Sequence, residues 1–411
     1  MNNDEIINWL LSNGNAFCPE LTSHIYVNSM GDIRPCCDGD KIVYNNKVFN
    51  IGNKSISEIA NHQVYYDMIE GMKAGIIPDS CKVCKDKTDP LSPRISNSVT
   101  PRNIEITKAA MNGDIKRTIN SVHIRVGNTC NLKCRICDYK LSSGWAKDEY
   151  KKQFYNKNIA YKDSHIYKTM EDGQWPFKQS NWLSSKELEN IVSLHLSGGE
   201  PLMVDKTYEM VDSILSVNNN IEIKFNTNST FKYKEEYLEK LLTAKEINFH
   251  LSIDDIGERF EYQRKNAKWD KVSKIAEWYV NLSKKYQNVH VAADVTISIF
   301  NVYYLPEIIK EFNKIGLNFR TIDSHSYDHY TRHTNQYYIR RLNKKQKEII
   351  FEKLNKYKEN KIINDVINYM SVDKKVFNNK ERLDIIKEVD LIRNESFEKV
   401  FPELYSILLL E

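Results

Sequence analysis

The sequence lacks the features of a membrane or secreted protein. No stretch reaches the roughly 18 consecutive apolar residues that cross a bilayer, and residues 1–15 have neither the basic start nor the apolar run of a secretory signal. These absences predict a cytoplasmic protein without a membrane partner. In a reducing cytoplasm, cysteines serve as metal ligands more often than they form disulfides.

The chain also has little net charge. Its 59 Lys and Arg residues against 55 Asp and Glu residues give a formal charge of +4, and the excess is not concentrated in one stretch. The basic runs after residue 340 are partly balanced by nearby acids, which favours solvated helix faces. Charge therefore does not favour nucleic acid as a partner, although it does not exclude it.

Cysteine is absent after residue 137, and the eight cysteines before that point form two groups. Three lie between residues 130 and 137, and five lie in the first 84 residues. Structural zinc sites usually combine a C-x2-C pair with a second pair or with two histidines, and the later group has neither. Three thiolates on a short loop instead suit three corners of a cubane iron-sulfur cluster and leave the fourth iron open to an outside ligand. We therefore expect two metal centres.

The string CNLKCRIC resembles the signature of the radical S-adenosylmethionine (radical SAM) enzymes, C-x3-C-x-φ-C, with Ile136 at the aromatic or apolar position φ. The resemblance implies that a 4Fe-4S cluster is held by Cys130, Cys134 and Cys137. It also implies that S-adenosylmethionine completes the open iron, and that one electron then cleaves its sulfonium C–S bond to give a 5'-deoxyadenosyl radical. Ile136 and Tyr139 are assigned to the cofactor pocket.

A glycine motif follows the next predicted strand. The segment IVSLHLSGGEP ends in Gly198, Gly199 and Glu200, which match the GGE motif that binds the methionine amino group in this family. Glycines let the backbone approach a ligand closely, and a carboxylate can accept from an ammonium.

Two later strand ends complete the cofactor pocket on the family pattern. They present polar groups suited to ribose hydroxyls or substrate, namely Asn226, Thr227, Asn228, Ser252 and Asp254. For Asn and Ser alone, a turn or cap at a strand end is the favoured alternative.

Arg264 occupies the place of the arginine that pairs with the methionine carboxylate, a partner that suits a bidentate guanidinium. Asp255 stands where many relatives carry glycine, so the turn beside Asp254 is expected to differ.

Strand and helix patterns alternate after residue 120. Apolar strand candidates near residues 121, 191, 221, 247, 289 and 317 alternate with amphipathic helical segments. With right-handed crossovers, six such units would curl into a partial barrel whose motif loops share one rim. The predicted fold class is α/β: a partial (β/α)6 TIM-like barrel of the radical SAM type, with a small N-terminal iron-sulfur module (β-hairpin plus helix) and a C-terminal helical extension. A long insertion, residues 141–190, is expected to have helical ends.

The first cysteine group predicts an auxiliary cluster. The pattern around Gly31 is that of a hairpin with Cys18 and Cys36 at its bases, and a C-x2-C pair follows a helical segment. This order resembles the twitch module, a shortened SPASM domain, although here it precedes the barrel. The resemblance assigns a second 4Fe-4S cluster to Cys18, Cys36, Cys81 and Cys84. A structural zinc ribbon is the alternative, and the leftover Cys37 is interpreted as a buried spare thiol.

We predict three regions: an N-terminal twitch/SPASM-like module (1–100), the radical SAM barrel (115–325) and a helical extension (326–411). In the polar segment after the last strand, Asp323 and His325 are candidate substrate contacts. A solvated polar loop is the equal alternative.

The predicted function is that of a radical SAM oxidoreductase. It would abstract a substrate hydrogen atom and complete an oxidative modification of a peptide or of a sugar or nucleotide, with the auxiliary cluster as an electron sink. Flavodoxin or ferredoxin would supply electrons. Epimerisation and RNA modification are the alternative reactions, and a zinc-ribbon RNA-binding or scaffold protein is the alternative outside the enzymes.

Overall fold

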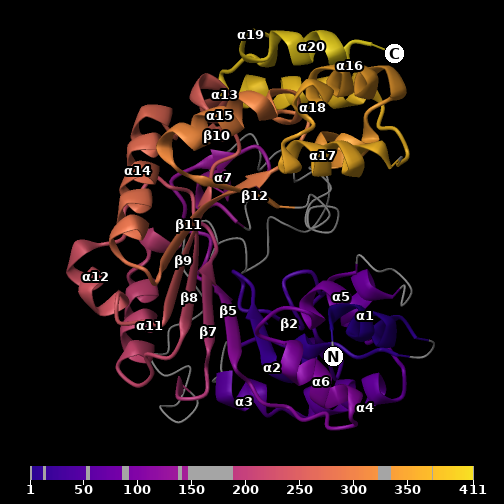
Figure 1. The fold of residues 1–411 in the computed structure, drawn as a ribbon, viewed down its shortest axis with the longest axis vertical. Coiled ribbons are helices and arrows are strands. Elements are labelled where there is room, and N and C mark those ends of the chain that lie inside the picture. The colour runs from indigo at the N-terminus through magenta and orange to yellow at the C-terminus, as the bar shows by residue number, and fades with distance from the viewer. Residues whose placement is uncertain are drawn as a thin grey trace. The chain divides into compact units, whose positions relative to one another are not determined.

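The computed structural model describes residues 2–12, 15–51, 56–85, 92–137, 141–146, 188–322, 335–372 and 374–410 (Figure 1). The chain divides into two compact units. The first unit comprises residues 1–129, 168–225 and 235–247, and the second comprises residues 130–167, 226–234 and 248–411.

A mainly parallel sheet organises the first unit. Its strands are β1 (His24–Val27), β2 (Ile33–Arg34), β5 (Ser121–Arg125), β7 (Ser193–Ser197) and β8 (Glu222–Thr227), whose last two residues belong to the second unit. They are hydrogen-bonded in the order β2-β1-β5-β7-β8, with β2 antiparallel to β1 and the other pairs parallel.

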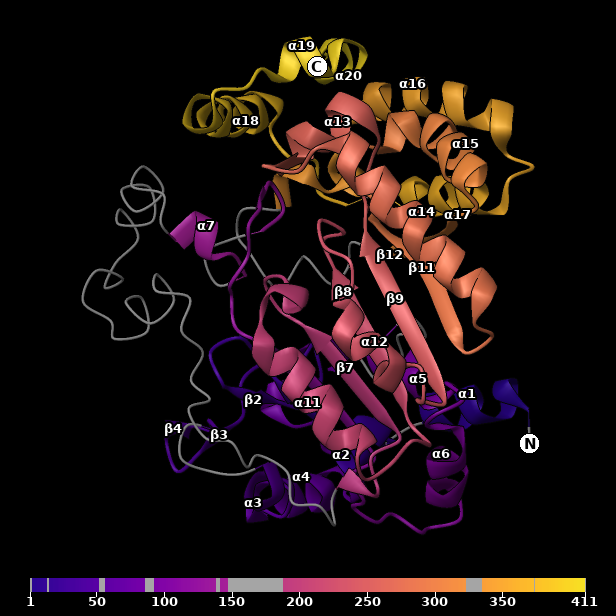
Figure 2. The ribbon, with the colours of Figure 1, turned by 90° about the vertical axis from the view of Figure 1, so that its left-hand side faces the viewer.

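Alternation of side chains explains the register of this sheet. Ile25 lies opposite Val122, which lies opposite Leu194. The next residues along these strands form a second row in which Tyr26 and His123 are neighbours. Because successive side chains of a strand point to opposite faces, one face is an apolar core and the other is polar. Figure 2 shows helix α11 (Asp205–Leu215) in front of the strands, with α12 (Glu235–Leu241) beside it.

The predicted N-terminal hairpin is present, and its first strand belongs to this sheet through parallel pairing of β1 with β5. Cys18 does not lie on the hairpin: it precedes the short helix α2 (Pro19–Ser23), which intervenes before β1. Pro19 explains the helix start, because its fixed φ suits the first helical turn and its missing N–H is not needed there.

Further elements of the first unit surround a small apolar core that includes Leu10, Phe17 and Met72. These elements are α1 (Asn3–Leu11), β3 (Val43–Tyr44), β4 (Lys47–Val48), α3 (Ile56–Ala60), α4 (Gln63–Lys73), a 3-10 helix (Asp79–Cys84), α5 (Pro93–Ser98) and α6 (Ile104–Met111).

The second unit continues the strand-helix alternation. Its strands β9 (Glu246–Ser252, beginning in the first unit), β11 (Val289–Thr296) and β12 (Asn318–Ile322) are ordered β9-β11-β12, and β11 pairs in parallel with β12. Helices α14 (Trp269–Lys285) and α15 (Leu305–Ile315) pack on β11 and β12. A two-stranded ribbon, β6 (Lys133–Cys134) with β10 (Arg264–Lys265), lies apart from these strands, and α13 (Gly257–Gln263) leads into β10.

The rest of the second unit is helical. It contains α7 (Ser143–Ala146), α16 (Lys344–Leu354), α17 (Lys361–Ser371), α18 (Asn379–Arg393), α19 (Phe397–Val400) and α20 (Pro402–Leu408). An aromatic cluster that includes Tyr262, Phe300 and Phe401 joins α13 to the last two helices.

The α/β class and its C-terminal helices are therefore as predicted, and each of the six predicted strands starts within two residues of its expected position. Most of the 141–190 insertion lies outside the described residues. In the part of the chain that is described, no helix has both the length and the apolar character of a membrane span.

Candidate functional site

The cysteine loop, residues 130–137, is shaped by backbone pairing within the second unit. β6 pairs antiparallel with β10, so that Cys134 lies opposite Arg264. Next to this pair, the Arg135 N–H donates to the Gln263 carbonyl at 2.9 Å. The Cys137 N–H donates to the Cys134 carbonyl at 3.1 Å. Backbone hydrogen bonds thus fix the part of the loop that contains Cys134 and Cys137.

The thiols of this loop influence one another. A hydrogen bond from Cys137 and the nearby Arg264 guanidinium lower the pKa of Cys134 to about 7, although burial opposes them. The same hydrogen bond, burial and the charges of Cys134 and Cys130 raise the pKa of Cys137. Three soft sulfur donors in one electrostatic neighbourhood fit an iron-sulfur cluster.

Arg264 and Asp254 contact each other. Nε and Nη2 of Arg264 lie 2.9 and 2.7 Å from Oδ2 of Asp254, and Nη1 lies 3.8 Å from Sγ of Cys134. The other carboxylate oxygen of Asp254 accepts from the Thr296 N–H at 2.9 Å. The structure therefore brings both residues to the cysteine loop, while their assigned roles toward ribose and methionine carboxylate stay predictions.

The two asparagines at the end of β8 have different neighbours. Asn228 donates to Asn131 Oδ1 at 2.9 Å and lies 3.6 Å from Cys130 Sγ, so it reaches the cysteine loop. Asn226 instead donates to Asp294 at 3.1 Å. Asp294 holds Arg320 through Nε at 2.6 Å and Nη2 at 2.7 Å.

Sequence reasoning missed Asp294. The only sequence signal for Asp294 was a carboxylate within the otherwise apolar end of the strand VHVAADVT. Ser252 ends β9 and Ile136 follows Arg135, and both side chains are half-buried. Tyr139, Asp323 and His325 lie outside the described residues.

The glycine motif packs against the backbone that leads into the cysteine loop. A Cβ on Gly198, whose φ is +132°, would lie 2.7 Å from the Gly127 carbonyl oxygen. A Cβ on Gly199 would lie 2.6 Å from the backbone carbonyl of Asn128. The Glu200 N–H donates to the Thr129 carbonyl at 2.7 Å. Only glycine permits this approach, and the next residue after Thr129 is the first cluster cysteine.

Glu200 is fully buried and caps the turn that follows it. Its Oε1 accepts from the Leu202 N–H at 3.1 Å. Binding of a methionine ammonium by this carboxylate stays a prediction.

A second set of cysteines lines one cavity in the first unit. The walls of this cavity include the four residues assigned to the auxiliary cluster, Cys18, Cys36, Cys81 and Cys84. Cys18 is the N-cap of α2, Cys36 follows β2, and the other two lie on the 3-10 helix. The Asp40 N–H donates to the Ser80 carbonyl at 2.7 Å and ties the Cys36 segment to that helix.

Burial dominates the chemistry of these thiols. It raises the pKa of Cys18 and Cys36 well above the ordinary value, and that of Cys81 to about 12, with the charges of neighbouring thiols adding to the effect. Bound iron would supply the positive charge that thiolates here require, because metal binding and thiol deprotonation are coupled. The donor set fits a fully thiolate-ligated cluster.

Cys37 lies outside the walls of this cavity, and its thiol donates to Asp38 at 3.4 Å. Among the described residues, no three His, Cys, Asp or Glu side chains are grouped as a single metal ion requires. A 4Fe-4S cluster differs in this respect, because each thiolate binds a separate iron.

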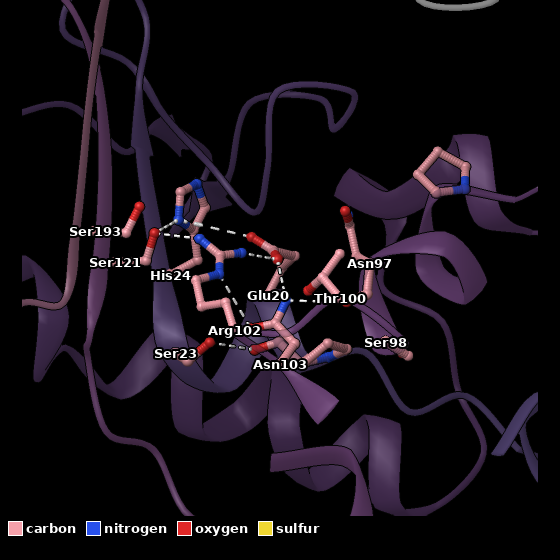
Figure 3. Close-up of polar contacts among 12 residues, drawn as sticks. Glu20, Ser23, His24, Asn97, Ser98, Thr100, Arg102, Asn103, Ser121 and Ser193 are labelled. Carbon is pink, nitrogen blue, oxygen red and sulfur yellow. Dashed lines mark hydrogen bonds and ion pairs between the residues drawn. The ribbon is translucent and has the colours of Figure 1, made fainter. Parts of the chain in front are cut away.

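A buried polar network adjoins the cavity (Figure 3). Glu20, on the cavity wall, pairs with Arg102 and accepts from Asn103 at 2.8 Å, and it lies 3.6 Å from His24. Burial raises the pKa of Glu20, but the charges of His24 and Arg102 and the Asn103 hydrogen bond outweigh it, so the pKa falls below its ordinary value. Arg102 and His24 also reach Ser121 of β5. This network, which the sequence did not reveal, connects α2 to the sheet.

Two family models match the chain. That of the Radical SAM superfamily matches residues 124–296, and that of SPASM, an iron-sulfur cluster-binding domain, matches residues 18–85. Residues 124–296 form a radical SAM domain. The predicted family is thereby confirmed, together with its cofactors, 4Fe-4S clusters and S-adenosylmethionine. The iron-sulfur domain precedes the radical SAM domain, as the cysteine order indicated.

Solved structures of low similarity include two of anSMEcpe and one of SuiB. "Native anSMEcpe with bound AdoMet" is 19% identical with a TM-score of 0.32, and the match covers 49% of this chain and 51% of that chain. "Native anSMEcpe with bound AdoMet and Cp18Cys peptide" is 20% identical with a TM-score of 0.33, over 49% and 50%.

Streptococcus suis SuiB bound to precursor peptide SuiA is 13% identical with a TM-score of 0.37, over 73% of this chain and 60% of that chain. The chain thus matches about half the length of the anSMEcpe structures. A comparison with curated proteins returned no match.

Proposed function

We propose that this radical SAM enzyme carries out an oxidative modification of a peptide or of a sugar or nucleotide, with the first-unit cysteines holding an auxiliary electron acceptor. The observation that carries the proposal is the cavity whose walls contain Cys18, Cys36, Cys81 and Cys84. Four thiolates complete the coordination of a 4Fe-4S cluster, and a cluster without an open iron is suited to electron transfer rather than to binding substrate.

The second-unit residues prepare the radical site. When bound, the cluster and S-adenosylmethionine supply a 5'-deoxyadenosyl radical that removes a hydrogen atom from substrate. Cys130, Cys134 and Cys137 would hold three irons. Arg264 places positive charge beside Cys134, and Asp254 fixes the orientation of Arg264 through two hydrogen bonds. A guanidinium held this way is ready to pair with a carboxylate without losing further side-chain freedom.

The first-unit residues would hold the auxiliary cluster through one buried cysteine, Cys84, and three half-buried ones, Cys18, Cys36 and Cys81. Burial is also the main cause that raises the pKa of the Cys18 and Cys36 thiols. A second acceptor suits a reaction that removes two electrons from substrate, since hydrogen-atom abstraction leaves a substrate radical with one more electron to lose. Flavodoxin or ferredoxin is the proposed reductant, and a cytoplasmic location is part of the proposal.

Anaerobic reconstitution tests this function. About eight irons per chain, together with methionine and 5'-deoxyadenosine after chemical reduction, are the expected results. Cys134→Ala should abolish cofactor cleavage, whereas Cys84→Ala should retain uncoupled cleavage and lose product. Candidate peptides and sugar nucleotides are then screened by mass spectrometry for loss of two hydrogen atoms. Two zinc ions per chain and no cleavage would support the zinc-ribbon alternative, and equal effects of the two substitutions would contradict the division of roles.

A further inference from the structure

Arg135 is a buried cation inside the cysteine loop. It follows Cys134 directly, and its side chain is 0% exposed. A charged group in such a place is retained only when opposite charges and hydrogen bonds compensate its lost hydration. Its compensating partners therefore show which part of the chain fixes the loop.

Those partners come from residues 390–397, which comprise the last turn of α18 and the link to the start of α19 and are called the 390–397 turn here. Nη2 of Arg135 pairs with Asp390 and lies 3.0 Å from Oε2 of Glu395. The guanidinium carbon lies 3.7 Å from the ring centroid of Tyr262, whose hydroxyl donates to Asp390 at 2.7 Å. The other carboxylate oxygen of Asp390 accepts from the Phe397 N–H at 2.6 Å.

The same turn also contacts the second strand of the ribbon. Lys265, in β10, donates to the Arg393 carbonyl at 2.8 Å and lies 3.3 Å from Oε1 of Glu395. Arg393 donates to the Tyr262 carbonyl at 2.6 Å and pairs through Nε with Glu395 at 2.9 Å. Both strands that shape the cysteine loop are thus bonded to the turn.

Packing alone does not require these charges. The aromatic contacts of Phe397 and Phe401 with Tyr262 and Phe300 already bury α19 and α20. Ion pairs buried at an apolar contact add little to stability compared with apolar groups of the same volume. Asp390 and Glu395 both pair with Arg135, and Glu395 also pairs with Lys265 and Arg393. These ion pairs are better explained by the orientation that they impose on the loop and on β10.

We propose that the 390–397 turn positions the radical SAM cluster: Asp390 and Glu395 hold Arg135 and thereby set where Cys134 and Cys137 present their sulfurs. This inference rests on the proposed function of the cysteine loop. It gives the C-terminal helices a role in the chemistry. These helices lie outside both family matches, which cover residues 124–296 and 18–85. Asp390 and Glu395 are positioning residues, because they act through Arg135.

The test uses the full-length reconstituted enzyme. Asp390→Asn removes the charge of that side chain and one of its two acceptor oxygens, so only one of the hydrogen bonds from the Tyr262 hydroxyl and the Phe397 N–H keeps its acceptor. The double variant Arg135→Met with Asp390→Asn removes the buried cation as well, so that loss of folding does not obscure the result. The matched control is Glu403→Gln, a carboxylate of α20 that accepts from Tyr304 at 2.8 Å and belongs to a different contact.

Iron content, S-adenosylmethionine affinity and the change that S-adenosylmethionine causes in the electron paramagnetic resonance (EPR) spectrum of the reduced enzyme are measured. Asp390→Asn and the double variant should bind S-adenosylmethionine about 10- to 100-fold more weakly, the range for residues that orient metal ligands, and lose that spectral change. Glu403→Gln should behave as wild type.

Variants with wild-type affinity and spectra, and only a lower melting temperature, would overturn the inference alone. A wild-type chain that loads no cluster at residues 130–137 would overturn the proposed function and this inference together.

Discussion

Arg264 is oriented by Asp254, whose Oδ2 accepts from both Nε and Nη2 at 2.9 and 2.7 Å. The third nitrogen, Nη1, is left 3.8 Å from the sulfur of Cys134. The guanidinium therefore faces a carboxylate on one side and a proposed cluster ligand on the other.

Arg264→Lys should weaken S-adenosylmethionine binding by about tenfold or more. An ammonium retains the charge but cannot place two nitrogens on Oδ2 of Asp254 and a third beside Cys134. Charge-assisted hydrogen bonds contribute roughly 1.5–3 kcal/mol. Titration of the reconstituted enzyme with S-adenosylmethionine, followed by EPR, measures the change. Arg259→Lys is the control, because Arg259 pairs with Asp255. Equal affinities for the two variants would count against a role of Arg264 in binding.

Gly199→Ala should reduce both stability and cluster loading. The added Cβ would meet the Asn128 carbonyl carbon at 2.6 Å, and the backbone that must move leads directly into Cys130. Overpacking of this kind costs roughly 1–3 kcal/mol. Urea unfolding and iron analysis give the two readouts. Gly71 lies in α4 with its nearest neighbour at 4.0 Å. Gly71→Ala should leave cluster loading unchanged and raise stability by about 0.5–1 kcal/mol, and an unaffected Gly199→Ala protein would show that the close approach is not needed.

Asp255 should make the protein less stable as the pH rises toward neutrality. Burial raises its pKa from 3.8 to about 7, although the nearby Arg259 and the Ile256 N–H act in the opposite direction. Because the folded-state pKa is above the unfolded one, the carboxyl contributes stability below about pH 4, and this contribution is lost as the pH rises through 7.

Each pKa unit corresponds to 1.36 kcal/mol, so the loss is on the order of 4 kcal/mol. The free energy of unfolding of wild type, minus that of Asp255→Asn, should therefore fall between pH 4 and pH 8. Urea titrations at several pH values measure this difference, and parallel pH profiles for the two proteins would disprove the assignment.

Arg94 should raise the reduction potential of the auxiliary site. Its guanidinium is 1% exposed, lies on the wall of the four-cysteine cavity and donates to the Leu10 carbonyl at 3.0 Å. A buried positive charge favours the more negative, reduced cluster. Arg94→Met should lower the potential by about 60 mV, a tenfold change in a one-electron equilibrium.

An EPR-monitored redox titration measures that potential. Arg117→Met is a matched control, because Arg117 is stacked on Tyr65 at 3.6 Å and does not line the cavity. The same shift in both variants would point to a general effect of lost charge rather than to Arg94.

The sequence predicted those features that repeat at short range. Alternation and length identified β5 and β11 within the chain. In these cases the residues that decide the structure are neighbours in sequence, and their pattern has a fixed period. The helix after Cys18 was missed, because Cys18 was placed at the base of the hairpin, although Pro19 is a signal for a helix start.

Contacts over long sequence separations could not be predicted in this way. Nothing in the string CRIC specifies that Arg135 meets Asp390, 255 positions later. Likewise, the resemblance assigns Arg264 and Asp254 separate roles toward the cofactor, and neither assignment indicates that the two residues pair. Which buried polar residues pair depends on how the tertiary structure brings them together. A single sequence therefore gives little information about these pairs.

The parallel pairing of β1 with β5 also limits how this protein can be divided. His24 through Val27 are matched residue for residue with Ser121 through Ile124. Deleting the N-terminal segment would turn β5, an interior strand in the first unit, into an open edge of buried β-branched residues, the kind of edge on which chains aggregate. The iron-sulfur segment is thus part of the scaffold. A truncated protein that begins at the first radical SAM motif is expected to aggregate even if its remaining site residues are intact.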